Sequence, residues 1–440
     1  MKIAELHQLF LESSGVGTDT RNIKRNSIFF ALKGESFNAN LFAIEALEKG
    51  ASYAVIDEKI IDFEKYSDRL ILVEDVLAAL QNLAGYHRQQ LTCPVLAITG
   101  SNGKTTTKEL IAAVLSKKFK TIATVGNLNN HIGVPLTLLS MPLDTEFAVV
   151  EMGANHQKEI EGYCKYAAPN FGMITNIGKA HLEGFGGIEG VAKGKSELYQ
   201  YLQDANGKVF VNGEDNVLSK NLFSRFKMQE NVILYGSNIE ASKQKNSTLG
   251  KIVSKGEMLS VEIGKGEKTF AINTHLVGDY NFPNLMAAVC IGQYFGVEDA
   301  SIKDAIEGYE PSNNRSQKIT QGTNTIILDA YNANPSSMIL ALENFEKLEG
   351  KNKIAVIGEM LELGDSSFLE HQKIADKVIQ MKLLKSIFVG EGFSFLKDKE
   401  GVIYFQNSSL LKEWYALQNF ENTTQLIKGS RKNGLEKLLQ

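Results

Sequence analysis

The residues most suited to chemistry lie in one short stretch, AITGSNGKTTTKEL at residues 97–110. Gly100 and Gly103 allow backbone N–H groups to face phosphate oxygens, and Lys104 adds a positive charge. The hydroxyl of Thr105 is suited to bind Mg²⁺. The stretch follows a strand-like apolar run and begins a helix-like segment, whose N-terminal end attracts anions. This order predicts a loop that binds the phosphates of a nucleotide.

One position departs from the general phosphate-loop pattern, because Ile98 stands where that pattern has its first glycine. The alternative interpretation is a glycine turn that only begins a helix. The order of strand, loop, lysine and helix favours the phosphate loop over this alternative.

Three residues farther along the chain carry groups that could hold or repel a metal ion. Glu151 ends the strand-like run FAVVE, where its carboxylate would lie beside the loop and hold Mg²⁺ directly or through water. His181 could bind a metal, although a single histidine after a strand is more often structural. Lys195 would repel Mg²⁺, so composition alone describes it as a surface lysine on a helix.

The apolar pattern around these residues indicates a parallel sheet covered by helices. Three apolar runs end in polar residues and are separated by helix-length segments: FAVVEMG (147–153), FGMITNIG (171–178) and KVFVNGED (208–215). Ligands of such sheets gather at the carboxyl ends of the strands. Short alternating runs between 245 and 275 indicate antiparallel strands that extend or flank the same domain.

The chain length and the changes in its texture predict three α/β domains. A chain of 440 residues is too long for one hydrophobic core, and about two to four domains are expected. The pattern changes near Cys93-Pro94 and again around the turn-rich YEPSNNR. We therefore expect domains at 1–90, at 91–311 around the phosphate loop, and at 312–440, where strand candidates again alternate with helices.

Charge and cysteine content indicate which partners the protein has and in which cellular compartment it acts. The 47 basic and 51 acidic residues give a net charge of −4 without a basic block, so no nucleic acid partner is expected. No apolar run approaches the length of a membrane span, and no membrane insertion is expected. Three isolated cysteines without metal-ligand spacing, and a start without a leader pattern, predict a cytoplasmic protein.

Eight motifs occur in order along nearly the whole chain, and together they carry a family resemblance. They are TDTRNIKRNSIFFALKGESF (18–37), TGSNGKTTTK (99–108), GNLNNHIGVPLTLL (126–139), EMGANH (151–156), NIGKAHLEGFG (176–186), YNANP (331–335), GEMLELG (358–364) and KGSR (428–431). With these motifs the chain closely resembles the Mur ligases, the ATP-dependent amide-forming enzymes of bacterial peptidoglycan precursor synthesis. The resemblance implies an N-terminal UDP-sugar domain, a central P-loop ATPase-like parallel sheet and a Rossmann-like C-terminal domain.

The resemblance changes the interpretation of Lys195, which occupies the family position of a lysine carbamoylated by CO₂. A carbamate is negatively charged and offers oxygen ligands, so it removes the objection to a lysine beside Mg²⁺. His181 matches the family's metal-binding histidine. With Thr105 and Glu151, these residues would hold two Mg²⁺ ions around the γ-phosphate of ATP. Lys104, His181 and Lys195 are the catalytic residues that the resemblance implies.

By the same resemblance, ATP is held by residues of the central and third domains. The expected contacts are Gly100, Ser101, Asn102, Gly103, Lys104, Thr105, Thr106, Asn281, Asn284, Arg315, Asp329 and Tyr331. Two positions depart from the family pattern. Tyr280 stands where a histidine is usual, and Asn314 stands where a glycine usually precedes the arginine.

Substrate contacts are implied in the first and third domains. Thr20, Arg21, Lys33 and Gly34 resemble the segment that receives the UDP-sugar, although the following residues 38–40 read Asn-Ala-Asn where Asp-Gly-His is more usual. The third domain would bind the incoming dipeptide, and its expected contacts are Asn332 and Asn334.

The implied activity is the joining of D-alanyl-D-alanine to UDP-N-acetylmuramoyl-tripeptide, with both as small-molecule substrates. A carboxylate is a poor electrophile near neutral pH, so ATP would first convert the substrate carboxylate into an acyl phosphate, which the amine of the dipeptide then attacks. Closure of the third domain through a hinge near 310 would exclude water and bring Arg315 to the site. Family analogy favours a monomer.

Two alternative functions are a sister ligase and, from a different class of function, a regulatory or binding module. A sister ligase would add a diamino acid, or glutamate to a folate, but the Asp-Asn-Pro-Arg type motif of the diamino-acid enzyme is not in this sequence. A regulatory or binding module would keep the fold and bind ATP without ligation. Lys104, Glu151, His181 and Lys195 are all in place and argue against it. The sequence leaves open whether the third residue of the acceptor peptide is lysine or diaminopimelate.

Overall fold

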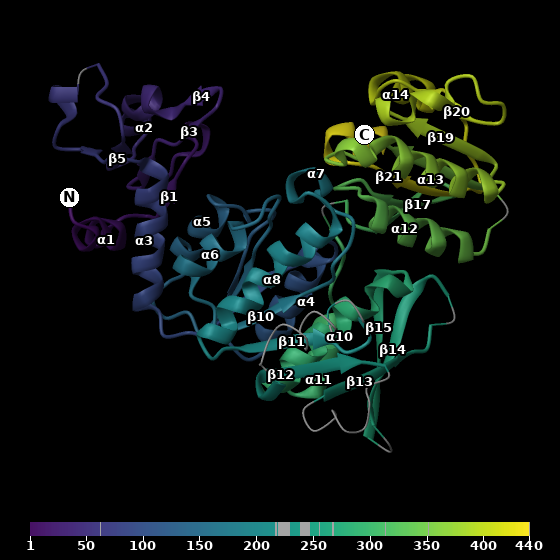
Figure 1. Cartoon of the computed structure of the whole chain (residues 1–440), viewed down its shortest axis with the longest axis horizontal. Helices are drawn as coiled ribbons and strands as arrows, with labels where there is room; N and C mark the ends of the chain where they lie inside the picture. Colours follow the sequence, from purple (N-terminus) through teal and green to yellow (C-terminus); the bar gives the residue numbers. More distant parts are fainter. Residues whose placement is uncertain are drawn as a thin grey trace.

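Three α/β units follow one another along the chain and lie in a row, from the purple N-terminal unit to the yellow C-terminal one (Figure 1). The computed structural model describes residues 1–61, 63–215, 218, 229–237, 247–254, 256–265, 268–312, 314–350 and 352–439. The α/β class predicted from the sequence is confirmed. Among the described residues, no helix combines the length and the apolar character needed to cross a bilayer.

The first unit is a small parallel sheet with the strand order β1-β2-β5-β6. Its strands are β1 (Val16–Gly17), β2 (Ile28–Phe30), β5 (Tyr53–Ile56) and β6 (Leu70–Leu72), and a short hairpin pairs β3 (Lys33–Gly34) with β4 (Phe37–Asn38). Its helices are α1 (Ile3–Glu12), α2 (Ala43–Glu48) and α3 (Val76–Gln90). Helix α3 packs against α1 and also against α5 and α6 of the central unit, so it joins the two units.

The central unit contains the largest sheet, with the order β15-β14-β13-β12-β11-β10-β7-β9-β8. Its parallel strands are β7 (Val95–Thr99), β8 (Thr121–Ala123), β9 (Phe147–Glu151), β10 (Phe171–Ile174), β11 (Lys208–Asn212), β12 (Val232–Gly236) and β13 (Ser247–Ile252). The antiparallel strands expected between 245 and 275 are confirmed as β13 pairing with β14 (Met258–Lys265), which pairs with β15 (Lys268–Val277).

Helices cover both faces of this sheet, and the apolar run of β7 shows the result. Val95 and Ala97 pack into one core cluster, whereas Leu96 and Ile98 pack into another on the opposite face. A strand buried on both faces is apolar throughout because every side chain enters a core. The helices of the unit are α4 (Lys104–Leu115), α5 (Gly133–Leu139), α6 (Glu159–Ala167), α7 (Leu182–Phe185), α8 (Ile188–Asp204), α10 (Phe282–Tyr294) and α11 (Asp299–Glu307).

The third unit is a sheet with the order β16-β17-β21-β18-β19-β20, parallel except for β16. Its strands are β16 (Gln317–Gln321), β17 (Asn324–Asp329), β18 (Lys353–Gly358), β19 (Lys385–Val389), β20 (Ile403–Phe405) and β21 (Thr424–Lys428), and its helices are α12 (Pro335–Lys347), α13 (Ser367–Gln380) and α14 (Ser408–Ala416). The described residues of all three units also form short 3₁₀ turns, at Thr20–Asn22, Ala39–Phe42, Phe63–Tyr66, Gln229–Asn231, Asp279–Asn281, Gly364–Ser366, Glu391–Leu396, Arg431–Asn433 and Leu435–Leu439.

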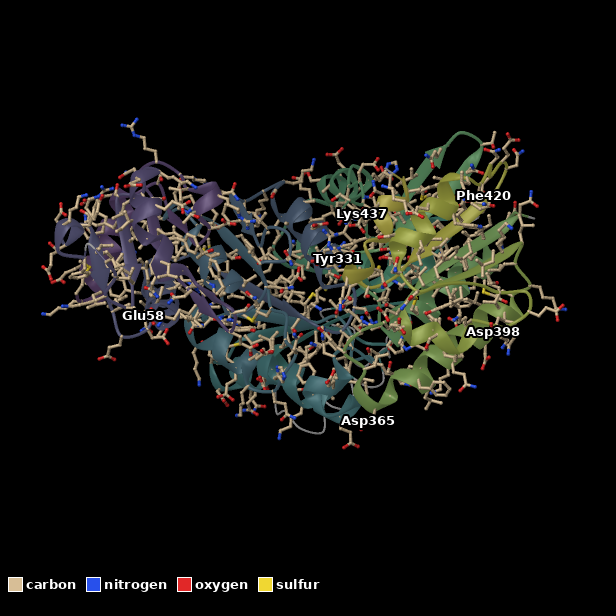
Figure 2. All side chains as sticks on the ribbon, turned by 90° about the horizontal axis from the view of Figure 1, so that it is seen from above. Glu58, Tyr331, Asp365, Asp398, Phe420 and Lys437 are labelled. Atoms are coloured by element: carbon tan, nitrogen blue, oxygen red, sulfur yellow. The ribbon has the colours of Figure 1, made fainter. Side chains whose placement is uncertain are left out.

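The carboxyl ends of the central and third sheets meet at one junction. Strands β7 and β9 end at Thr99 and Glu151, and β17 of the third unit ends at Asp329. Figure 2 shows Tyr331 at this junction, with Glu58 in the first unit and Asp398 in the third. Because polar loops follow these strand ends, a ligand site forms where the sheets face each other.

Candidate functional site

The predicted phosphate loop connects β7 to α4 and requires its glycines. Gly100 has a φ of +145°, and a Cβ there would lie 1.9 Å from the hydroxyl oxygen of Thr175. Gly103, with a φ of +77°, precedes the first residue of α4. The amide of Asn102 donates to the side-chain oxygen of Asn176 at 3.0 Å, which ties the loop to the end of β10. The loop backbone is therefore held open at the positive end of α4.

Lys104 is half-buried and turned back onto its own loop. Its Nζ donates to the carbonyl oxygen of Gly100 at 2.8 Å. Burial lowers the pKa of Lys104, partly offset by the nearby carboxylate of Glu151. A partly desolvated ammonium of this kind gains charge compensation when an anion such as a phosphate enters the site.

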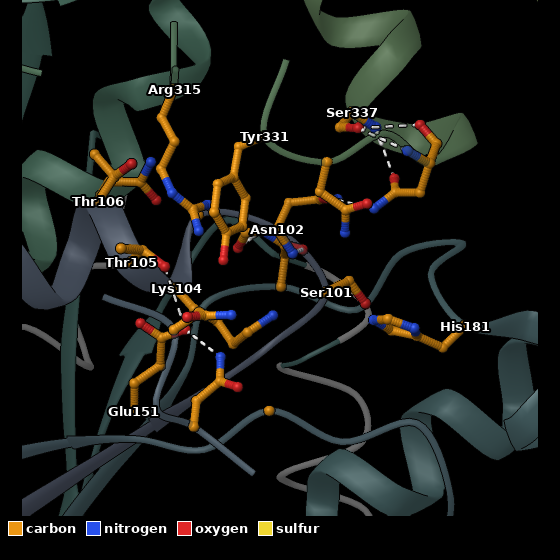
Figure 3. A pocket seen from close by; sticks show the side chains of 18 of the residues that line it. Ser101, Asn102, Lys104, Thr105, Thr106, Glu151, His181, Arg315, Tyr331 and Ser337 are labelled. Carbon is orange, nitrogen blue, oxygen red and sulfur yellow. Dashed lines mark hydrogen bonds between the residues drawn. The ribbon is translucent and has the colours of Figure 1, made fainter. Parts of the chain in front are cut away.

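Glu151 carries the strongest local sign of a cation site. Its side chain is 1% exposed, and its Oε1 accepts hydrogen bonds from Asn129 at 2.7 Å and from the hydroxyl of Thr105 at 3.2 Å (Figure 3). Its Oε2 is buried without a hydrogen-bond partner, and the nearest cation is Lys108 at 3.9 Å. An unsatisfied carboxylate oxygen beside a threonine hydroxyl suits a hard cation.

The described residues contain no group of three or more His, Cys, Asp and Glu side chains that could enclose a metal. Mg²⁺ usually binds through one or two carboxylates while it keeps several waters and substrate phosphate oxygens. The Thr105 and Glu151 pair therefore fits Mg²⁺ that arrives with a nucleotide, rather than a metal held by the protein alone.

Lys195 is fully buried on α8, so its description as a surface lysine from composition is wrong. Its Nζ lies 5.3 Å from the centre of the Phe185 ring. Burial, and secondarily the charge of Lys104, lowers the pKa of Lys195 to about 7. A substantial fraction of this amine is neutral near pH 7, and a neutral amine is the form that reacts with CO₂. Lys195 lies outside the lining of the cavity described below.

His181 directly precedes α7, has a φ of +53° and borders two cavities. Its Nδ1 lies in hydrogen-bonding contact with Oε2 of Glu362 from the third unit. Because an ionised carboxylate only accepts hydrogen bonds, Nδ1 is the donor. This hydrogen bond holds the pKa of Glu362 below its ordinary value.

A cavity of about 480 Å³ brings most of the predicted residues together. The predicted residues among its lining are Ser101, Asn102, Gly103, Lys104, Thr105, Thr106, Glu151, His181, Asn281, Asn284, Arg315, Asp329, Tyr331, Asn332 and Asn334. Figure 3 shows Arg315 and Tyr331 approaching Lys104 and Thr105 from the other side of the cavity. Residues of the central and third units thus surround one cavity, although some of them are more than 200 positions apart in the sequence.

The third unit contributes a cation and an aromatic ring to this cavity. The guanidinium carbon of Arg315 lies 3.6 Å from the centre of the Tyr331 ring, and its Nε is buried without a hydrogen-bond partner. Asp329 accepts a 2.5 Å hydrogen bond from Lys428, whose side chain is 2% exposed. Tyr280, the departure from the family pattern, donates to the hydroxyl of Ser316 at 2.8 Å and thereby links the central and third units.

Asn281 and Asn284 are tied to the helix that follows the phosphate loop. Asn284 donates to the side-chain oxygen of Asn281 at 2.9 Å and accepts from the hydroxyl of Thr107 at 3.1 Å. Both asparagines are buried at the start of α10. This contact places both asparagines next to α4.

The four predicted UDP-sugar residues lie away from this cavity in the first unit. Arg21 pairs with Asp19 at 2.6 Å, and Lys33 bridges to Asp57 and Glu58 at 3.0 and 2.8 Å. Thr20 lies in the 3₁₀ turn Thr20–Asn22, and Gly34 lies in strand β3. None of the four lines the 480 Å³ cavity.

Two further cavities adjoin the first one. A cleft of about 1390 Å³ between α3 and α6 shares His131, Glu159 and Tyr163 with it. A cavity of about 390 Å³ shares His181, Asn332 and Asn334 with it, and is also lined by Arg431 and Lys432. The central space therefore opens toward the first unit and toward the third.

Several lining residues received no role from the sequence. They include Asn129, His131, Lys428, Glu362 and Arg431, which lie in the quoted motifs GNLNNHIGVPLTLL, KGSR and GEMLELG. Their presence in these motifs is the sequence feature that could have identified them as site residues. Their partners are brought to them only by the fold, because each lies elsewhere in the chain: Glu151 for Asn129, Asp329 for Lys428 and His181 for Glu362.

Comparison with known proteins finds the same organisation elsewhere. Residues 98–292 match the Mur ligase middle domain, and residues 314–403 match the Mur ligase, glutamate ligase domain. The UDP-N-acetylmuramoyl-tripeptide–D-alanyl-D-alanine ligase of Bacillus subtilis is 35% identical over 97% of this chain and 92% of its own length. The enzyme of that name from Escherichia coli is 32% identical over 99% of this chain and 95% of its own.

Solved structures agree with these sequence matches. A crystal structure of MurF from Acinetobacter baumannii superposes with a TM-score of 0.83 at 29% identity, covering 98% of this chain and 97% of that one. MurF ligase from Thermotoga maritima, solved in complex with ADP, has a TM-score of 0.82 at 25% identity over 100% of this chain and 97% of its own.

Proposed function

The chain belongs to the Mur ligase family, and from that premise we propose how its residues carry out the family's reaction. It is an ATP-dependent ligase that joins D-alanyl-D-alanine to UDP-N-acetylmuramoyl-tripeptide in peptidoglycan synthesis. The observation that carries the mechanism is the meeting of the phosphate loop, Glu151 and Arg315 around one cavity that opens toward both outer units.

ATP would lie in the 480 Å³ cavity with its phosphates on the loop. The backbone donors of residues 100–106 and the ammonium of Lys104 would neutralise the β- and γ-phosphates. Arg315 would approach the nucleotide from the third unit, where its unpartnered Nε supplies a free donor. Asn281 and Asn284 would hold the adenine side, and Asp329 and Tyr331 would face the nucleotide.

Two Mg²⁺ ions would be held by Thr105, Glu151, His181 and a carbamate on Lys195. When bound, these ions neutralise phosphate charge and orient the oxygens of the γ-phosphate. The orphan Oε2 of Glu151 supports this proposal, because it is a ligand oxygen that the protein itself leaves unsatisfied. The lowered pKa of Lys195 supports carbamoylation, since only a neutral amine adds to CO₂.

The substrate peptide would reach the phosphates along the cleft between α3 and α6. Its terminal carboxylate attacks the γ-phosphate, which releases ADP and forms an acyl phosphate. The cleft lies on the side of the first unit, where we propose that Thr20, Arg21, Lys33 and Gly34 receive the UDP-sugar. A long substrate can thereby place one end in the first unit and the other at the phosphate loop.

The dipeptide would enter through the 390 Å³ cavity. Arg431 and Lys432 supply positive charges for its carboxylate, and Asn332 and Asn334 lie between them and the phosphate site. Its amine attacks the acyl carbon and expels phosphate, which completes the amide. With the third unit closed over the site, water is kept from the acyl phosphate.

We also propose a monomer that acts in the cytoplasm, where ATP and the UDP-linked substrate are both present. The three cavities share lining residues within one chain, which supports a reaction that does not require a second copy.

Phosphate release from ATP tests this function. Purified protein with Mg²⁺ is given D-alanyl-D-alanine and UDP-MurNAc-tripeptides that end in lysine or in diaminopimelate. We expect release with one tripeptide, and no release when either the tripeptide or the dipeptide is omitted. The active tripeptide identifies the third residue. ATP binding without turnover in every combination would favour the binding-module alternative.

A further inference from the structure

The loop between β10 and α7 contacts the third unit through two acidic side chains. Glu362 accepts a hydrogen bond from Nδ1 of His181, and Glu370 pairs with the Nζ of Lys179 at 2.6 Å. The amide of Lys179 also donates to the hydroxyl of Ser336 at 2.9 Å. One short loop of the central unit is thus held at three points by the unit that carries Arg315.

Both residues of the histidine contact have an uncommon backbone conformation. His181 has a φ of +53°, and Glu362 has a φ of +62°. The backbone carbonyl of Glu362 accepts from the amide of Glu183 at 3.3 Å, so backbone and side chain of Glu362 contact the same turn. Non-glycine residues keep positive φ values where their surroundings hold them there, and such positions concentrate at functional sites.

The direction of the hydrogen bond determines what the other imidazole nitrogen can do. With Nδ1 donating to a carboxylate, Nε2 of the neutral ring carries the lone pair. Histidines that bind metals are commonly oriented by a carboxylate on the opposite nitrogen, which fixes the tautomer and the plane of the ring. Here the carboxylate belongs to a different unit from the histidine.

We propose that Glu362 is a positioning residue for His181, which it aligns for the metal-bound nucleotide only while the third unit is closed. The inference rests on the ligase function proposed above. It makes His181 competent when Arg315 is in place, because Glu362 and Arg315 belong to the same unit. ATP would then react only in the closed enzyme.

The ion pair of Lys179 with Glu370 provides a matched control. It lies on the same loop and spans the same two units, but it does not touch His181. Glu370→Gln therefore weakens the contact between the units without changing the imidazole. Glu362→Ala removes the acceptor of His181, and Glu362→Gln keeps a neutral amide oxygen in its place.

Steady-state kinetics of the three variants separate the roles. We expect Glu362→Ala to lower kcat by about 10- to 100-fold, the usual range for a carboxylate behind a metal-binding histidine. The KM for D-alanyl-D-alanine should stay near the wild-type value. Glu362→Gln should restore much of kcat, and Glu370→Gln should keep it within about threefold of the wild type.

The protonation site of the His181 imidazole can be measured by NMR, independently of catalytic turnover. In protein labelled with ¹⁵N-histidine and bound to ADP, long-range ¹H–¹⁵N spectra distinguish a protonated Nδ1 from a protonated Nε2. His181→Gln identifies the signals. At a pH well above the ordinary imidazole value, we expect protonated Nδ1 in the wild type and in Glu370→Gln, and a shift toward protonated Nε2 in Glu362→Ala.

Three results would overturn the proposal. They are an unchanged tautomer in Glu362→Ala, a rise in the KM for D-alanyl-D-alanine with unchanged kcat, which would make Glu362 a dipeptide contact, or an equal loss of kcat in Glu370→Gln. Failure of the ligase function is distinguishable, because the wild-type protein would then release no phosphate with any substrate.

Discussion

At the scale of single residues, burial determines the chemistry of the site. Glu151 keeps one carboxylate oxygen without a partner, and Lys195 keeps an ammonium away from water. Each arrangement costs free energy in the empty protein, because a buried charge without a partner is unfavourable. The ligands proposed here act on both costs: a cation would compensate Glu151, and CO₂ would convert Lys195 into a carbamate whose negative charge Mg²⁺ would in turn compensate.

Carbamoylation of Lys195 is directly observable. In buffer containing ¹³C-bicarbonate we expect a ¹³C carbamate signal that is absent in Lys195→Arg. The signal should weaken as the pH falls below about 7, because the pKa of Lys195 is lowered to that value and protonation removes the nucleophile. Lys195→Arg should lose activity by about 100-fold or more, as expected when a charge that stabilises the transition state is removed.

Lys193 supplies the control for this experiment. It lies on the same helix two residues earlier, but it is exposed. Lys193→Arg should keep both the signal and the activity. A carbamate signal that persists in Lys195→Arg would place the modification elsewhere.

At the scale of elements, the turn from β7 into α4 depends on close backbone approach. Gly100→Ala would place a methyl group against Thr175 at a φ that L-residues avoid. We expect a loss of roughly 3 kcal/mol or more from strain and overpacking together, along with weaker ATP binding. Chemical denaturation and nucleotide titration measure the two effects.

Gly126→Ala isolates backbone strain from the clash. Gly126 has a φ of +55°, and a Cβ there meets no atom within 4 Å. This variant should lose only about 1–2 kcal/mol, the cost of a left-handed alanine. Equal losses in both variants would contradict a role for the contact between Gly100 and Thr175.

Helices α1 and α3 are joined by a buried histidine pair that makes their packing sensitive to pH. Nε2 of His7 lies 3.1 Å from Nδ1 of His87, and the rings of Phe10 and Tyr86 contact His7 in tilted and edge-on orientations. Nε2 of His87 also lies 2.8 Å from the carbonyl oxygen of Met141. Burial lowers the pKa of both histidines from the ordinary value of 6.5, and the charge of His87 lowers that of His7 further.

The sign of the pH effect follows from this direction. Below pH 6.5 the unfolded chain takes up protons that the folded pair resists, so stability should fall as the pH drops through 6.5 toward the lowered folded values. Above pH 6.5 both histidines are neutral in the unfolded chain as well, so the pair no longer makes stability depend on pH. His7→Gln should flatten this acid-side slope in denaturation curves at pH 5 to 8. An unchanged slope would show that other groups cause the acid sensitivity.

At the scale of the whole molecule, function depends on contact between the central and third units. Asn334 donates to the side-chain oxygen of Asn102 in the phosphate loop at 2.7 Å. The same residue caps α12, because its side-chain oxygen accepts from the amide of Ser337 at 2.9 Å. One asparagine thus begins a helix of the third unit and touches the loop of the central one.

Two substitutions separate these roles. Asn334→Ser keeps a good helix cap but is too short to reach Asn102, so thermal stability should be kept while the KM for ATP rises severalfold. Asn334→Ala loses the cap as well and should also lose about 1 kcal/mol of stability. Small-angle scattering with ADP should show a less compact Asn334→Ser protein. A scattering curve that matches the wild type would rule out a role in closure.

The sequence alone was enough for the fold class, the family and the reaction. Gly100, Gly103, Lys104 and Thr105 are close together in the sequence, so one stretch of residues is enough to predict a phosphate loop. Inner strands such as β7, β9 and β18 carry continuous apolar runs because both of their faces are buried, and such runs predict strands from the sequence. Local spacing and periodicity contain this information, and motif order added the family.

Only the tertiary structure decided which groups are buried and which meet. Lys195 reads as a solvated charge in the sequence, and its burial depends on how α8 packs. The contacts of Glu362 with His181 and of Lys428 with Asp329 join residues about 100 to 180 positions apart. Charge, desolvation and hydrogen bonding act through space, so no local pattern contains them.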